Sequence, residues 1–159
     1  MSALVLGVGN ILLADEGVGV RVVEAFQKRY VTPEGVDVLD GGTAGMDLLD
    51  ALSGRSHIVI ADAVRTGAEP GTIVRLTGKQ VPALFNNRIS PHQLGISDVL
   101  AILRLVDQEP GHIALIGIVP AGLDPGLDLS SVIADRIDEM VELVADELRS
   151  HGFIVNPVA

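Results

Sequence analysis

The sequence predicts an α/β fold, a single domain over residues 1–159 in which a twisted, mostly parallel sheet carries helices on both faces. Short apolar runs alternate with longer segments of helical periodicity, which is the pattern of strands joined by crossover helices. The apolar residues are mainly Val, Leu, Ile and Ala, and aromatic residues make up only 3% of the chain. This composition is typical of buried parallel strands and the helices that cover them.

The first half of the chain is predicted to supply three parallel strands and two helices. The strands are expected over residues 3–8, 36–39 and 57–61. A helix is expected to begin near Asp15, because apolar side chains recur every four residues from Val18 to Tyr30 and form one face. Pro33 and Gly35 end this helix, and a second, short helix is expected over residues 46–52.

The second half is predicted to complete the sheet and its helical cover. The expected elements are a short, antiparallel strand over 72–76, a loop over 80–92, a helix over 96–106, a strand over 113–119, a loop over 120–129 and a helix over 133–148. Gly152 follows the last helix, where a glycine commonly forms the C-terminal cap.

The charge and the amino-acid composition exclude several classes of function. With 11 Lys and Arg against 21 Asp and Glu, the net charge is −10, which disfavours nucleic acid and anionic membrane surfaces as partners. The chain has no cysteine, so a metal site must be built from histidine and carboxylate ligands. No apolar run reaches the length of a membrane span, and no signal-like leader precedes the first strand. We therefore expect a cytoplasmic protein.

Acidic and glycine-rich segments follow the first three predicted strands. Glu16 comes after the first strand, Asp40 with Gly41 and Gly42 after the second, and Asp62 after the third. In open α/β sheets, ligands bind outside the carboxyl ends of the strands. We therefore expect these side chains to meet at one edge of the sheet.

Each candidate also has a purely structural interpretation. Asp15 is expected to cap the first helix, since acidic residues in a first turn satisfy free N–H groups, and this leaves Glu16 to face the strand ends. Asp62 is either a site residue that the sheet holds in place or a helix-cap or turn carboxylate. His92 follows a proline in a predicted loop, where it is either a ligand or an ordinary solvated side chain.

The other three histidines have expected positions outside this site. His57 and His112 precede strands, and His151 lies at a helix C-terminus, where a positive charge is favourable. Glu16, Asp62 and His92 together offer three oxygen and nitrogen ligands to a divalent cation and leave positions for water or substrate. The sequence contains neither the H-E-x-x-H motif of zinc proteases nor the G-x-S-x-G motif of serine hydrolases.

A non-catalytic nucleotide- or metal-binding accessory protein is the alternative. Gly7-Val8-Gly9 after the first strand invites a dinucleotide-binding interpretation, with Asp40 as the ribose-binding acid. The third glycine of that motif would fall at position 12, which is leucine, and close helix–strand packing needs glycine there.

Four segments, in this order and at this spacing, resemble the maturation proteases of nickel–iron hydrogenases. They are Gly7-x-Gly9-Asn10-Ile11-Leu12-x-x-Asp15-Glu16-Gly17-x-Gly19-Val20, Asp40-Gly41-Gly42-Thr43-Ala44-Gly45, Ala61-Asp62-Ala63 and Ser90-Pro91-His92-Gln93. The resemblance covers nearly the whole chain, except residues 154–159.

The resemblance implies a peptidase, aspartic-type or metal-dependent, that removes a C-terminal peptide from the hydrogenase large-subunit precursor after nickel insertion. Glu16, Asp62 and His92 would contact the metal. This metal would be nickel supplied by the precursor, and zinc or cadmium can occupy the site in vitro. Asp40 is the candidate general base. Gly41, Gly42 and Thr43 are the candidate substrate-binding residues. Cleavage of a single tail requires only a monomer, which is the expected state.

Overall fold

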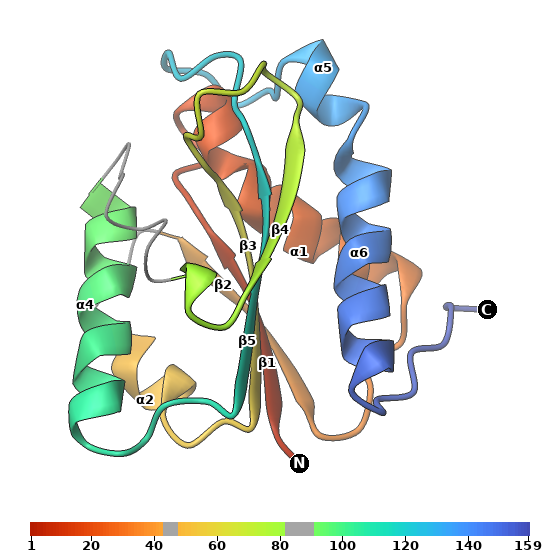
Figure 1. The fold of residues 1–159 in the computed structure, drawn as a ribbon. Coiled ribbons are helices and arrows are strands. Elements are labelled where there is room, and N and C mark those ends of the chain that lie inside the picture. The colour runs from red at the N-terminus through yellow and green to blue at the C-terminus, as the bar shows by residue number, and fades with distance from the viewer. Residues whose placement is uncertain (43–47, 82–90) are drawn as a thin grey trace.

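A five-stranded sheet runs through the middle of the protein (Figure 1). The computed structural model describes residues 1–42, 48–81 and 91–159, and only the backbone of residues 91–95 and 97. The strand order is β2-β1-β3-β5-β4, and all neighbours are parallel except β4 and β5. The strands are β1 (Ala3–Val8), β2 (Val36–Gly42), β3 (His57–Ala63), β4 (Ile73–Thr77) and β5 (His112–Ile118). The predicted fold class and the antiparallel strand are confirmed.

Helices cover both faces of this sheet, as predicted. The helical elements are η1 (Ala14–Gly17, a 3-10 turn), α1 (Val18–Arg29), α2 (Leu49–Leu52), α4 (Pro91–Leu105), α5 (Ser131–Ala134) and α6 (Ile137–Ser150). α1 and α6 lie on one face, and α2 and α4 lie on the other (Figure 1). Within the described ranges, no helix has the length and apolar character needed to cross a membrane.

The alternation of side chains along each strand divides the core into two layers. Val5 of β1 and Val59 of β3 pack with α1 and α6, whereas Leu4 and Ile60 pack with α2 and α4. This division follows from the two-residue period of a strand, which turns successive side chains to opposite faces. The even-numbered position Asp62 therefore lies on the α2–α4 face of β3.

Glycines bring the start of α1 directly onto the carboxyl ends of the strands. A Cβ on Gly19 would lie 2.1 Å from the carbonyl oxygen of Ala61 and 2.4 Å from that of Val8. Gly9 has a φ of +138° and would place a Cβ 1.8 Å from the carbonyl oxygen of Glu16. Only glycine permits this approach of backbone to backbone, so these positions set the distance between η1–α1 and the sheet.

Two strands extend beyond their predicted ends. β2 was expected to stop at Leu39 and β3 at Ala61, but both continue for two or three residues. The ladder persists because neighbouring strands still offer partners: Asp40 pairs with Gly7, and Asp62 pairs with Gly117. The two acidic residues therefore belong to the strands, and their backbones are fixed by the sheet.

Two helical predictions also need correction, and one about a helix end is confirmed. α4 begins at Pro91, so His92 lies in its first turn and not in a loop; proline is favoured at a first helical position because its missing N–H is not needed there. The helix predicted over 133–148 is divided into α5 and α6. Gly152 has the left-handed φ, +90°, expected of a cap. Most of the predicted 80–92 loop, and part of the 46–52 helix, lies outside the described residues.

Asp15 does not cap the helix as we predicted; its side chain joins η1 to the loop over residues 120–130. Among the described residues, no side chain caps η1 or α1. The carboxylate of Asp15 is 0% exposed and accepts hydrogen bonds from the backbone N–H groups of Ala121 (2.9 Å), Gly122 (2.8 Å) and Ser130 (2.8 Å), and from the Ser130 hydroxyl (2.7 Å). Burial raises the pKa of Asp15, but these hydrogen bonds outweigh burial and hold it below its ordinary value of 3.8.

Substitution Gly19→Ala should destabilise the fold strongly. Its Cβ would collide with carbonyl oxygens of two strands, which cannot rotate away, so we expect a loss of about 2 kcal/mol or more in the free energy of unfolding. Urea denaturation followed by circular dichroism measures this loss. Gly122→Ala is the matched control, because a Cβ there meets nothing within 4 Å. Equal stability of the two variants would contradict the packing described.

Substitution Asp15→Asn should cost about 2 kcal/mol or more at pH 7, because the amide cannot accept from four donors. The folded-state pKa of Asp15 is lowered, so its contribution is complete above the ordinary carboxyl pKa and is lost as pH falls through the lowered value. The stability difference from the unsubstituted protein should therefore shrink only below about pH 4. Urea unfolding at several pH values tests this, with the exposed Asp124→Asn on the same loop as a control that should show no difference.

Candidate functional site

An open cleft lies at the carboxyl ends of β1 and β2. Its volume is about 340 Å³. The lining residues are Gly9, Asn10, Ile11, Leu12, Val20, Asp40 and Gly42. The cleft is therefore formed by the segment after β1, the end of β2 and the first turn of α1. This is the edge at which the sequence predicted a ligand site.

Asp40 borders this cleft and is exposed to solvent. Its Oδ1 accepts a hydrogen bond from the backbone N–H of Gly42 at 2.9 Å, and Gly42 has a left-handed φ of +50°. The register of β2 against β1 shifts just beyond Asp40, so that Val8 pairs with Gly42. Asp40, Gly41 and Gly42, which the sequence grouped together, thus form a local turn at the end of β2.

Glu16 lies in η1 and is only 5% exposed. η1 contacts the end of β3, and the close approach of Gly9 to the backbone of Glu16 holds it against the end of β1. The 3-10 turn thus places Glu16 over the ends of two adjacent strands. The predicted proximity of Glu16 to the carboxyl edge of the sheet is confirmed.

Asp62 is 0% exposed, and its Oδ1 accepts a hydrogen bond from the backbone N–H of Ala63 at 2.8 Å. It follows Ile58 and Ile60 on the face of β3 that packs against α2 and α4. Its position inside the central strand β3 makes the alternative of a helix-cap or turn carboxylate wrong. Asp62 is a buried acid at the carboxyl end of the sheet.

The first turn of α4, which carries His92, lies at this same end and on this same face (Figure 1). The described structure includes the backbone of His92 but not its side chain, and Thr43 lies outside the described residues. The fold therefore brings the chain at Glu16, Asp62 and His92 to one end of the molecule. The three-ligand set itself stays a prediction, as does the role of Thr43.

Asp40 and Asp62 lie on opposite faces of the sheet. Val36 and Val38, which alternate with Asp40 along β2, pack in the α1–α6 layer, and Val20 of α1 lines the cleft beside Asp40. Asp62 lies on the α2–α4 face. Asp40, the candidate general base, and Asp62, a candidate ligand, thus lie at the carboxyl edge on opposite faces of the sheet. Their strands, β2 and β3, are separated by β1.

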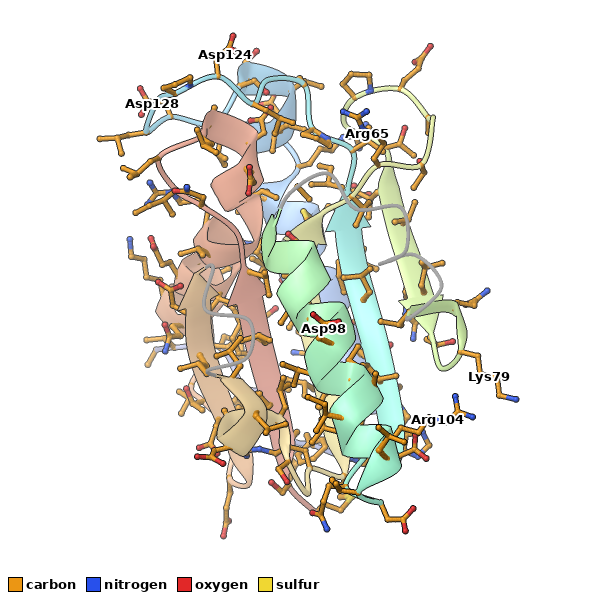
Figure 2. All side chains as sticks on the ribbon, turned by 90° about the vertical axis from the view of Figure 1, so that its left-hand side faces the viewer. Arg65, Lys79, Asp98, Arg104, Asp124 and Asp128 are labelled. Carbon is orange, nitrogen blue, oxygen red and sulfur yellow. The ribbon has the colours of Figure 1, made fainter. Side chains whose placement is uncertain are left out.

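The loop over residues 120–130 is a part of this end that sequence reasoning missed. It is fastened to η1 through Asp15, and Ala14 donates a backbone hydrogen bond to Gly126 at 2.8 Å. Figure 2 shows Asp124 and Asp128 on this loop, at the same end of the molecule as Arg65. The only signal in the sequence was Asp15, which we attributed to helix capping.

This arrangement suits a metal-assisted or carboxylate-assisted reaction on an extended chain. Carboxylate and imidazole groups are ligands for nickel and zinc. An exposed carboxylate in a cleft can accept a proton from water. The glycines at the end of β2 allow another backbone to approach closely.

Comparison with known proteins agrees with this arrangement. A family model described as hydrogenase maturation protease matches residues 20–147. The chain is 48% identical, over 153 residues, to the hydrogenase 2 maturation protease of Escherichia coli strain K12, covering 96% of this chain and 93% of that protein. The solved structure of the hydrogenase maturating endopeptidase HybD from E. coli superposes with a TM-score of 0.96 at 48% identity, covering 99% of this chain and 98% of that one.

A more distant structure is also similar: the [NiFe] hydrogenase maturation protease HybD from Thermococcus kodakarensis matches at 29% identity and a TM-score of 0.76, over 92% of this chain and 99% of that one. These matches support the prediction of a maturation peptidase and not the alternative of a non-catalytic accessory protein. The family match, the near-complete coverage and the common fold show that this chain belongs to the hydrogenase maturation protease family.

Proposed function

We propose that this protein removes a C-terminal peptide from the precursor of a nickel–iron hydrogenase large subunit, after nickel has been inserted into that precursor. Family membership supports the peptidase activity. The observation that supports this choice of site is the pair of buried carboxylates, Glu16 and Asp62, at the carboxyl edge of the sheet beside an open cleft. The cytoplasmic location and the monomeric state expected from the sequence stay predictions.

Recognition would depend on the nickel of the precursor. Glu16 and Asp62 offer oxygen ligands and His92 offers a nitrogen ligand, a set that suits a borderline divalent cation such as nickel. Contact with the precursor's nickel would fix the scissile bond relative to the cleft, which is catalysis by positioning. A precursor without nickel would lack this anchor. The same ligand set would accept zinc or cadmium in vitro.

The tail of the precursor would bind along the end of β2. Within the described part of the chain, β2 is an edge strand that pairs only with β1. An exposed strand edge can accept an extended peptide as an additional strand. Gly41 and Gly42 of β2 would lie against such a peptide, because glycine allows close approach of another backbone. Thr43, the next residue in the sequence, is assigned the same role.

Asp40 would act as the general base. It would take a proton from the attacking water, whose oxygen adds to the scissile carbonyl carbon. The carbon–nitrogen bond would then break, and the proton would be returned to the leaving amine. The exposure of Asp40 on the wall of the cleft gives water access to its carboxylate. A carboxylate would thus activate the water, and the metal would position the substrate.

The first test compares cleavage of nickel-loaded and nickel-free precursor by the purified protein. We expect loss of one short C-terminal peptide, seen by intact mass, only from the loaded precursor. A zinc-loaded precursor serves as the control for the identity of the metal. Cleavage regardless of nickel would leave an endopeptidase but remove the role of the metal. A loaded cognate precursor that stayed intact would contradict the proposed function.

Substitutions should separate recognition from water activation. Glu16→Gln, Asp62→Asn and His92→Gln should weaken binding of the nickel-loaded precursor. Asp40→Asn should preserve binding but slow single-turnover cleavage by about 10² to 10⁴-fold, the usual contribution of a general base. Asp98→Asn is the matched control, because Asp98 is an exposed side chain on α4 (Figure 2) and should change neither quantity. Full activity of Asp40→Asn would assign the general base to another group.

A further inference from the structure

Three of the four histidines meet at the end of the sheet opposite the cleft. His57 is the first residue of β3, His112 is the first residue of β5, and His151 follows the last turn of α6. The register of the parallel strands pairs His57 directly with His112. In Figure 1 this end of the sheet and the C-terminal end of α6 lie together, far from the first turn of α4. The fourth histidine, His92, lies in that distant turn.

The three imidazoles are close enough to share one ion. One nitrogen from each ring can be chosen so that all three lie within 4.8 Å of one another. Some point is then within about 2.8 Å of every nitrogen, compared with a zinc–nitrogen bond of about 2.0–2.1 Å. Side-chain adjustments of less than about 1 Å would therefore complete the coordination. The three histidines, with Glu147, are among the residues that line a cavity of about 10 Å³, close to the size that holds one water molecule.

The neighbours of His57 prepare it to act as a ligand. The Ser56 hydroxyl donates its proton to the carbonyl oxygen of Ser2, and Ser56 Oγ lies 2.8 Å from His57 Nδ1. Because that hydroxyl proton is already used, we infer that Nδ1 of His57 carries a hydrogen and donates it to Ser56. The other ring nitrogen, Nε2, then has the free electron pair that a metal needs. Such support from a second residue is usual for metal-binding histidines.

The burial of the three imidazoles differs, with His57 buried, His151 intermediate and His112 exposed. His112 is exposed, so an ion can enter from solvent without local unfolding.

Glu147 of α6 supplies a negative charge and orients His151. It is 4% exposed, and its Oε1 lies 3.3 Å from Nε2 of His151. Its other oxygen, Oε2, accepts hydrogen bonds from Arg75 of β4, including one from Nε at 2.9 Å. A carboxylate that accepts from the outer nitrogen of a histidine leaves the remaining nitrogen, here Nδ1, for the metal.

We propose that His57, His112 and His151 form a second metal site, which binds one borderline divalent cation such as Zn²⁺ or Ni²⁺, with Glu147 as the carboxylate that orients His151. The geometry leaves a fourth position for water or another ligand, as in three-histidine zinc sites. The bound ion would join the end of α6 to the amino-terminal edge of the sheet. This site is separate from the cleft, and its existence does not depend on the proposed peptidase mechanism.

The test measures Zn²⁺ binding in a protein that carries His92→Gln, which removes the histidine of the predicted cleft site. Isothermal titration should show binding of one zinc ion in this background. Adding His112→Gln and His151→Gln should weaken that binding by at least about tenfold, because even the loss of an outer-shell partner costs this much. Thermal unfolding should report the same difference, with zinc raising the Tm only when the three histidines are present.

Nuclear magnetic resonance of the imidazole groups identifies the ligands directly. In the His92→Gln protein, whose other three histidines are unchanged, one equivalent of zinc should shift the ring resonances of His57, His112 and His151. Circular dichroism confirms that each variant is folded, and the single variant His112→Gln, at an exposed position, provides a mild alternative to the double substitution. Zinc binding that is unaffected by these substitutions, or absent altogether at micromolar zinc, would overturn the proposal. So would shifts confined to residues at the cleft.

Discussion

The contact on which the site depends is the close approach of the η1–α1 segment to the carboxyl ends of β1 and β3. Gly19 lies against carbonyl oxygens of both strands, and Gly9 lies against the carbonyl of Glu16. These are contacts between backbones, so side-chain rearrangement cannot replace them. They determine the height of η1 above the sheet and therefore the position of Glu16. They also determine the position of the first turn of α1, whose Val20 lines the cleft together with Asp40.

Asp15 extends this constraint to the other side of the site. Four hydrogen bonds attach the 120–130 loop to the same 3-10 turn that carries Glu16. Two consecutive acidic residues thus have different roles. Asp15 binds the 120–130 loop, and Glu16 lies above the ends of the strands. A buried carboxylate with this many donors is a rigid element, because each donor would lose its partner if the loop moved away. The site is therefore assembled from segments that are far apart in sequence but share one anchor.

The two ends of the sheet differ in chemistry because of the direction of the strands. In a parallel sheet all strands begin at one edge and end at the other, so residues of similar position along different strands gather together. The carboxyl edge gathers Asp40 and Asp62, with Glu16 beside them. The amino-terminal edge gathers His57 and His112, and α6 returns to that edge to add His151. The same topology thus brings the three acidic residues to one end and three of the four histidines to the other.

The sequence by itself determined the fold class, the succession of strands and helices along the chain, and the edge of the sheet to which Glu16, Asp40 and Asp62 belong. These follow from local periodicity and from the rule that strand ends gather, neither of which needs a three-dimensional structure. Family membership was likewise evident in motifs that stand in fixed order.

Only the tertiary structure decided the rest. The ends of β2 and β3 depend on partners in neighbouring strands, so Asp40 and Asp62 lie inside strands that local signals ended too early. The role of Asp15 depends on donors more than 100 residues away in the chain, and local propensity favoured a cap instead. The histidine cluster depends on the register of β3 with β5 and on where α6 ends. Each of these is a contact between distant segments, which the packing of the folded chain creates and which no local pattern encodes.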